Sequence, residues 1–279
     1  MNLAVTQRTN GAGFPKPGEL IEITGAHALE ASDRAILNLL YQHVHDSGRM
    51  GETNAEWSIS LSALRFDASH KGNERVADSL DRLLRVIANV PYTLADGEPR
   101  ILKTHLFDFF DLPSDETWAP PTNVRFGLPK MLQPVLVNSN RWGRIKAEVV
   151  CAMTSKYAIA LYELVQLRAN MDRCVETFPL ARFRDLMGVP SGRLLRAHDF
   201  ERFVLHPAKL EVNGLSDTGV DVAIKRRSVR APIEAIIVTW WPKDADEHRA
   251  AVRERAASKV GRMARLRGVV ETVSPAGAA

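Results

Sequence analysis

Apolar residues recur every three or four positions in two stretches of the first half of the chain. This spacing predicts a helix over residues 32–46 and a longer helix over residues 73–88. Between them, residues 57–60 alternate as a short strand does, and residues 61–66 fit one brief helix. The residues that carry the two stripes are Ile36, Leu37, Leu39, Leu40 and Val44, followed by Val76, Leu80, Leu83, Leu84 and Ile87.

Strand-like segments follow the longer helix. Residues 91–94 and 101–110 are rich in β-branched and aromatic side chains, and the Asp96-Gly97 dipeptide between them is a turn signal. A further strand is expected at residues 123–126, beyond a proline-rich loop. The first half therefore reads as helix, strand, short helix, long helix and hairpin.

The second half shows the same order again. Thr154 is a candidate cap for a helix, residues 181–187 form a short helix, and residues 197–213 form a long one. Two strands at residues 219–224 and 233–240 then flank a basic loop. This order is that of the winged helix-turn-helix. The prediction is an α+β fold with two tandem winged-helix domains related by pseudo-twofold symmetry.

The expected domain limits follow from the same pattern. We expect a flexible N-terminal arm, a first winged-helix domain, a linker, a second winged-helix domain that is the main DNA reader, and a basic C-terminal tail. Their limits are residues 1–18, 19–135, 136–149, 150–243 and 244–279. In the tail, Val252, Ala256, Val260 and Met263 recur at helical spacing. This spacing predicts either a marginal amphipathic helix that orders on binding DNA or a host replication protein, or a tail that only adds solubility.

Composition narrows the class of protein. Hydrophobic residues make up 45% of the 279, which indicates a globular chain, and two cysteines are too few for a disulfide scaffold. No apolar run has the length of a membrane span, and the first 18 residues lack the apolar core of a signal peptide. We therefore expect a cytoplasmic protein without metal, cofactor or membrane contact.

The formal net charge of +4 is unevenly placed. Residues 1–179 hold 19 Lys and Arg against 21 Asp and Glu, whereas residues 180–230 hold 10 against 6. Residues 249–267 add 7 basic side chains against 1 acidic. A polyanionic partner such as nucleic acid follows from this distribution.

The candidate DNA contacts are basic residues placed where a winged helix meets DNA. The long helix and its entrance should read base edges in the major groove, and the wing should contact phosphates. The mixed charge of residues 73–88 favours backbone or dimer contact instead. These residues are Arg193 and Arg196 at the entrance, Arg202, His206 and Lys209 on the helix, Lys225, Arg226, Arg227 and Arg230 on the wing, and Lys71 and Arg75 in the first domain.

Residues 154–164, 180–190 and 199–213 resemble the second winged-helix domain of the iteron-binding plasmid replication initiators. The shared features include Val204-Leu-His-Pro-Ala208 and Glu211-Val-Asn213. The resemblance implies iteron binding by the second domain, a dimer interface in the first, and monomers as the initiating form. It also implies origin opening, recruitment of a host replication initiator and the replicative helicase, and repression of the protein's own promoter.

The same sequence also allows functions other than replication initiation. A winged-helix transcription regulator without an initiation role remains the alternative. His43-Val-His45 matches the metal-binding pattern of rolling-circle nickases, but it falls at the end of a helical stripe, where the two imidazoles diverge. Gly-x-Gly-x-x-Gly and phosphate-loop patterns are absent, so ATP use is not supported. We expect no catalytic residues. The apolar run Leu106, Phe107, Phe109 and Phe110 is either a subunit-pairing hairpin or core.

Overall fold

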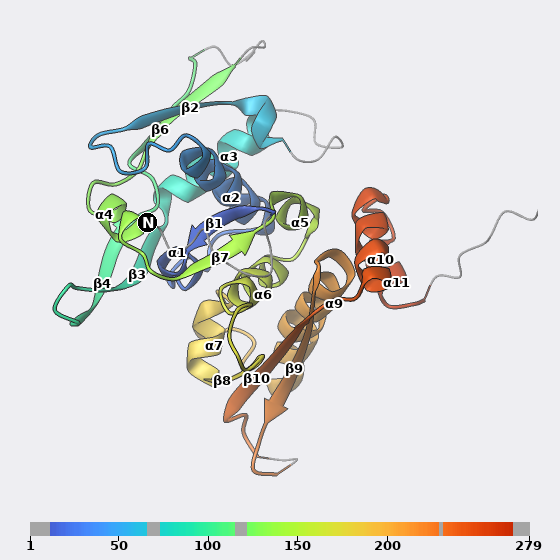
Figure 1. Cartoon of the computed structure of the whole chain (residues 1–279). Coiled ribbons are helices and arrows are strands. Elements are labelled where there is room, and N and C mark those ends of the chain that lie inside the picture. The colour runs from blue at the N-terminus through green and yellow to red at the C-terminus, as the bar shows by residue number, and fades with distance from the viewer. Residues whose placement is uncertain (1–11, 66–72, 115–121, 229–230, 270–279) are drawn as a thin grey trace, which may run out of the picture.

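The computed structural model describes residues 12–65, 73–114, 122–228 and 231–269. Helices and strands alternate through it (Figure 1). Its buried apolar side chains form a continuous cluster that spans both halves. No helix among these residues is long and apolar enough to cross a membrane. The predicted α+β class with repeated element order is confirmed.

The first half contains the predicted helix, strand, short helix, long helix and hairpin. The helix predicted over residues 73–88 ends three residues earlier, at Arg85, because Ile87 pairs with His105 as the first residue of a strand. The elements are α2 (Ala31–Asp46), β2 (Glu56–Ser60), η2 (Leu61–Leu64), α3 (Asn73–Arg85), β3 (Ile87–Thr93), β4 (Pro99–His105), β5 (Phe109–Asp111) and β6 (Asn123–Gly127).

The strand predicted over residues 101–110 is in fact two strands in different sheets. β4 pairs with β3, whereas β5 pairs with β6 in the three-stranded sheet β2-β6-β5. The chain changes sheets at Leu106 and Phe107, which are fully buried. Phe110 is half-buried, and its ring centroid lies 4.9 Å from that of Phe107. Packing of the core therefore accounts for this apolar run.

The second half forms the sheet β8-β10-β9 and the helices that pack on it. Ser155 caps the first of these helices with its hydroxyl, in place of the predicted Thr154. The elements are α6 (Lys156–Gln166), β8 (Val175–Pro179), α7 (Leu180–Leu186), α8 (Ala197–Phe200), η3 (Glu201–Leu205), α9 (His206–Leu215), β9 (Thr218–Lys225) and β10 (Ala235–Pro242).

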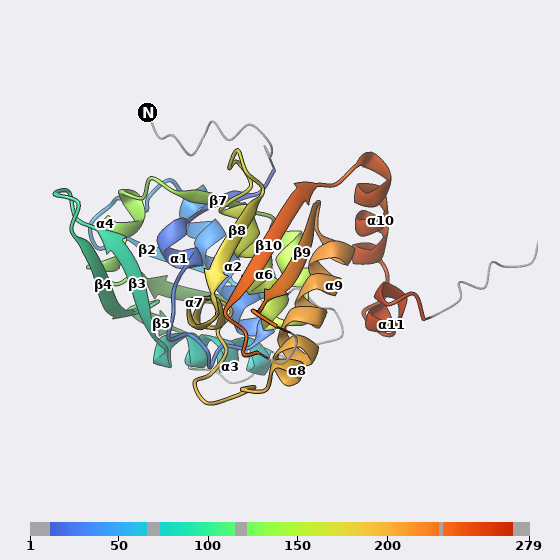
Figure 2. The ribbon, with the colours of Figure 1, turned by 90° about the horizontal axis from the view of Figure 1, so that it is seen from below.

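The elements α8, η3 and α9 form one continuous helix over residues 197–215, which we call the long helix (Figure 2). Its middle turn is a π-turn, in which the amide of His206 donates to the carbonyl of Glu201. Pro207 follows directly; it has no amide hydrogen, and its ring would clash with the carbonyl of residue 203 in a regular α-helix. The wider turn accommodates this proline without ending the helix.

The predicted flexible arm and linker are wrong where the structure describes them. Strand β1 (Phe14–Pro17) is buried and pairs with β7 (Trp142–Ile145), inside the presumed linker. Prolines in a strand are tolerated at an edge, and β1 lies in a two-stranded sheet. Three short helices overlap the ends of these segments: α1 (Gly18–Ile21), α4 (Leu132–Val137) and α5 (Ala147–Ala152).

The tail is also folded rather than marginal. Helices α10 (Ala245–Ala256) and α11 (Arg262–Leu266) pack against α9, and we call them the C-terminal helix pair (Figure 1). Ala251 is the buried residue of α10, whereas Val252 and Val260 of the predicted apolar stripe are exposed. The stripe prediction is wrong: the buried residues of the pair are Ala251 and Arg262, which are not part of the predicted stripe.

A buried polar cluster joins the two halves. The Nζ of Lys16 donates to Oε1 of Glu163 at 2.7 Å and to Oδ1 of Asn38 at 3.2 Å. The amide of Asn38 donates to the same Glu163 oxygen at 2.7 Å. Burial lowers the pKa of Lys16, and the neighbouring Glu163 carboxylate opposes that shift. Strand β1, helix α2 and helix α6 are thereby held together.

We expect Glu163→Gln to lower the free energy of unfolding by about 3–5 kcal/mol, because it leaves the Lys16 ammonium buried without a counter-charge. The matched control is Glu98→Gln, which breaks the exposed pair with Arg100 and should cost less than about 1 kcal/mol. Urea denaturation of both variants measures the difference. Similar losses in the two variants would contradict the role of the buried pair.

Candidate nucleic-acid interface

The long helix has one buried face and one exposed face. Phe200, Val204 and Ala208 are buried, as their spacing predicts, and α9 packs on α6. Arg202 and His206 are exposed on the outer side. The guanidinium of Arg202 lies over the ring of Phe203, 5.2 Å from its centroid. Two of the three helix residues predicted to contact DNA are therefore exposed.

Lys209 differs from the other two. Its Nζ donates to Oδ1 of Asp221 on β9 at 2.9 Å, and this hydrogen bond lowers the pKa of the Asp221 carboxyl. Two features turn Lys209 toward the sheet: the π-turn shifts the helical phase after residue 205, and an acidic partner stands on β9. Lys209 must exchange this partner for a phosphate in order to contact DNA.

The turn before the long helix is held by an arginine that the sequence did not mark. Arg184 of α7 donates to the carbonyls of Leu194, at 3.0 Å, and Arg193. Its guanidinium also lies 5.0 Å from the ring centroid of Phe200. Leu194 has φ of 51°, a left-handed backbone that leucine rarely adopts. Arg193 and Arg196 are exposed on this turn.

The wing is the hairpin of β9 and β10. Lys225 is exposed at the end of β9, and Arg226 is half-buried just beyond it. The Nε of Arg227 donates to Oε1 of Glu234 at 2.6 Å, although the arginine side chain is mostly exposed. Arg230 lies outside the described residues. The wing thus carries cationic side chains beyond the sheet.

Several basic side chains of the first half form contacts within the fold. Arg75 is exposed on α3, and Lys71 lies outside the described residues. Arg82 makes a two-bond contact with the buried Asp33 carboxylate, with both N–O distances 2.8 Å, and Arg85 pairs with Asp81. Several basic groups of α3 therefore stabilise the fold.

The residues of the nickase alternative lie on a helix. His43 and His45 belong to the last turn of α2, where His43 stacks near Phe126 and His45 pairs with Asp46. In the part of the chain that the structure describes, no group of three or more His, Cys, Asp or Glu side chains could hold a metal ion. Burial raises the pKa of the Cys151 thiol to about 12, so this cysteine stays protonated at neutral pH.

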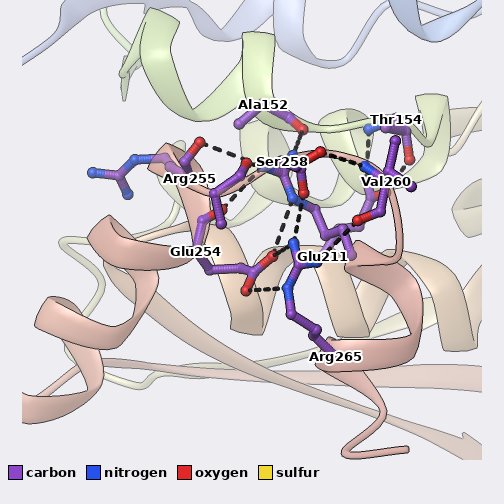
Figure 3. A network of polar contacts seen from close by, with 10 residues as sticks. Ala152, Thr154, Glu211, Glu254, Arg255, Ser258, Val260 and Arg265 are labelled. Atoms are coloured by element: carbon purple, nitrogen blue, oxygen red, sulfur yellow. Dashed lines mark hydrogen bonds and ion pairs between the residues drawn. The ribbon is translucent and has the colours of Figure 1, made fainter. Parts of the chain in front are cut away.

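The junction between α5 and α6 is contacted by the long helix and by the C-terminal helix pair (Figure 3). Buried Glu211 of the long helix accepts hydrogen bonds from the amides of Thr154 and Ser155, both at 3.0 Å, and from the Thr154 hydroxyl. A carboxylate in this position also suits the positive end of the α6 dipole. The long helix is thereby fixed to the start of α6.

The C-terminal helix pair holds the other side of that junction (Figure 3). Arg262 is buried, and it donates to the carbonyl of Ala152 at 2.7 Å and to carbonyls at the end of α10. Lys259 donates to the carbonyl of Cys151 at 3.2 Å, and Arg255 to that of Leu215 at 2.7 Å. Unpaired carbonyls at the ends of α5 and α9 thus gain cationic donors from the tail.

A helix-turn-helix with a basic entrance turn, an exposed basic helix and a basic wing defines a winged-helix DNA-binding protein. The comparisons identify the family. The first winged-helix domain of the initiator replication proteins (Initiator Replication protein, WH1) matches residues 16–166, and the second (Initiator Rep protein, WH2) matches residues 179–240. The chain belongs to this family: it is a DNA-binding replication initiator with two winged-helix domains.

The fold also matches a solved structure. The crystal structure of the Pi initiator protein in complex with iteron DNA aligns with a TM-score of 0.60 and 12% identity, over 83% of this chain and 97% of that chain. At this identity the likeness supports the fold. No curated protein matches the chain in sequence.

We expect Arg262→Met to lower the free energy of unfolding by about 1–3 kcal/mol, because it leaves buried carbonyls without a donor. Arg249→Met is the control, since Arg249 is exposed and pairs with Asp246 within α10. Urea denaturation and thermolysin digestion, followed by mass spectrometry, report stability and release of the C-terminal helix pair. Equal digestion of the two variants would show that Arg262 does not hold the pair.

Proposed function

We propose that this protein initiates plasmid replication by binding directly repeated iteron DNA at the origin through its second domain. The observation that carries the proposal is the long helix, with exposed Arg202 and His206, entered through a turn that presents Arg193 and Arg196. Arginine at the start of a recognition helix can bind guanine with two hydrogen bonds. The likeness to an initiator solved with iteron DNA supports the same target.

The two parts of the interface contribute differently. Arg193 and Arg202 are best placed for base edges, and Lys225 and Arg226 on the wing are best placed for phosphates. Lys209 and Arg227 also pair with carboxylates of the fold, and binding DNA would exchange these partners for phosphates. Arg196 and His206 support the helix in the groove. Arg230 and Lys71 remain candidates from the sequence.

The first domain has an auxiliary role in this proposal. Arg75 contacts the DNA backbone, and subunits pair through the first domain in equilibrium with monomers. The free edge of β4 is the supporting feature, because β4 pairs only with β3 among the described residues and Ile101 is 66% exposed on it. Leu106 and Phe107 are buried in the core, so the proposed interface is the edge of β4 rather than this apolar run.

The remaining steps follow from an initiator's task. Bound protein opens the origin and recruits a host replication initiator and the replicative helicase, without catalysis of its own. Binding at its promoter would repress its synthesis. These events take place in the bacterial cytoplasm, where the plasmid lies.

We expect Arg193→Ala and Arg202→Ala each to reduce discrimination between the cognate repeat and scrambled DNA by about 1–3 kcal/mol, if the lost contact has two hydrogen bonds to a base. Arg226→Ala should instead weaken both complexes together and reduce the slope of log affinity against log salt by about 0.9. Fluorescence anisotropy over a salt series measures both quantities.

Arg100→Ala is the control for these variants, because Arg100 is an exposed arginine on the hairpin of the first domain. It should leave discrimination unchanged. The assignment is reversed if the wing variant loses specificity while the helix variants lose only uniform affinity. Unchanged binding by all three variants would remove the interface.

We expect Ile101→Arg to shift the protein toward monomer, because it places a charge on the proposed pairing edge. Met131→Arg is a matched control, since Met131 is also 66% exposed but lies beside α4. Light scattering coupled to size exclusion, over a range of concentrations, gives the masses. A wild-type protein that is monomeric at every concentration would contradict the dimer.

A further inference from the structure

Leu195 is an apolar side chain in an unusual place. It lies on the turn that enters the long helix, between the exposed Arg193 and Arg196, and it is 77% exposed. A single exposed leucine is ordinary on a protein surface. This leucine, however, projects from the segment whose arginines are proposed to enter the major groove.

The backbone around Leu195 is fixed in an uncommon conformation. Leu194 adopts a left-handed φ of 51° and packs its side chain against the core. Gly192, two residues earlier, also has a positive φ. The turn therefore directs one leucine inward and the next outward. Strained backbone of this kind persists where the surrounding structure over-determines it, often at functional sites.

Arg184 supplies much of that restraint. It donates to two successive carbonyls of the turn, those of Arg193 and Leu194, while its guanidinium stacks on the buried Phe200. The amide of Arg193 donates to the carbonyl of Pro190 at 3.1 Å. Leu195 is thus presented by a rigid turn, which lowers the entropy lost when it binds.

The chemistry of the major groove offers one apolar group, the 5-methyl of thymine. We propose that Leu195 reads a thymine methyl group in the bound repeat, and that Arg184 is the positioning residue that holds Leu195 in place. Arg193 and Arg196 on either side supply the charge that brings this turn into the groove. The inference deepens the proposed function and rests on it.

The test removes single methyl groups from the DNA. The wild-type chain first selects a preferred duplex from a random pool, and each thymine of that duplex is then replaced by uracil, one at a time. At the contacted position wild type should bind the uracil duplex about fourfold more weakly, as expected for one buried methyl-sized group. Leu195→Ala should bind the two duplexes equally. Val260→Ala, which shortens a side chain 84% exposed in the tail, should keep the wild-type ratio.

Arg184→Met tests the positioning role. Methionine keeps an apolar contact with Phe200 but cannot donate to the carbonyls of the turn. The variant should lose the thymine-over-uracil ratio while keeping the slope of log affinity against log salt, because the wing phosphate contacts remain. A folded Arg184→Met protein that keeps the ratio would overturn the role of Arg184.

The outcomes separate this inference from the proposed function. If no sequence is enriched from the pool, sequence-specific binding itself fails. If a sequence is enriched but no thymine replacement affects wild type, or if Leu195→Ala keeps the wild-type ratio, then Leu195 does not read a methyl group, and the proposed function stands. Weaker binding of Leu195→Ala to thymine and uracil duplexes alike, with the ratio unchanged, would also overturn it.

Discussion

The ammonium of Lys16 and the carboxylate of Glu163 meet in the interior, on segments 147 residues apart in the sequence. Neither charge could be buried alone, because each would lose its hydration without compensation. Their partnership, completed by Asn38, requires β1, α2 and α6 to take fixed relative positions. All three residues lie within residues 16–166, the span that the first winged-helix domain matches, so this domain is held together by a polar contact as well as by its apolar core.

Charged groups also fix the position of both ends of α6. Glu22 accepts from Arg168 at 2.7 Å and from Arg141 at 2.9 Å, which links the residues just after α1, just after α6 and just before β7. Desolvation alone would raise the pKa of Glu22, but these hydrogen bonds outweigh it and the pKa is lowered. At the start of α6, Glu211 adds a contact from the long helix. The reading surface is thus connected to the first domain through α6.

The spacing of apolar residues along the sequence predicts the helices whose side chains face the core. The stripes of α2, α3 and the long helix follow from side chains that must face a core, and Phe200, Val204 and Ala208 are buried as expected. The sequence missed β1, since its two prolines are typical of a mobile arm until a partner strand is known. Helical spacing predicts that Lys209 faces outward, and it cannot show that Asp221, twelve residues further on, lies beside it on β9. The sequence also does not mark Arg184, because the groups that it holds are backbone carbonyls, which every residue has.

The π-turn in the long helix has a consequence for how this family member can change its target. One extra residue in that turn separates the register of α8 from that of α9 by roughly 100°, the angle per residue of a helix. The C-terminal half of the long helix packs against α6, β9 and the C-terminal helix pair. The N-terminal half follows the turn that carries Arg193 and Arg196, which are proposed to read DNA. Insertion or loss of a residue at Glu201–Leu205 would rotate one half against the other. Such a change would alter which side chains the half proposed to read DNA presents, and it would leave the anchored half in place.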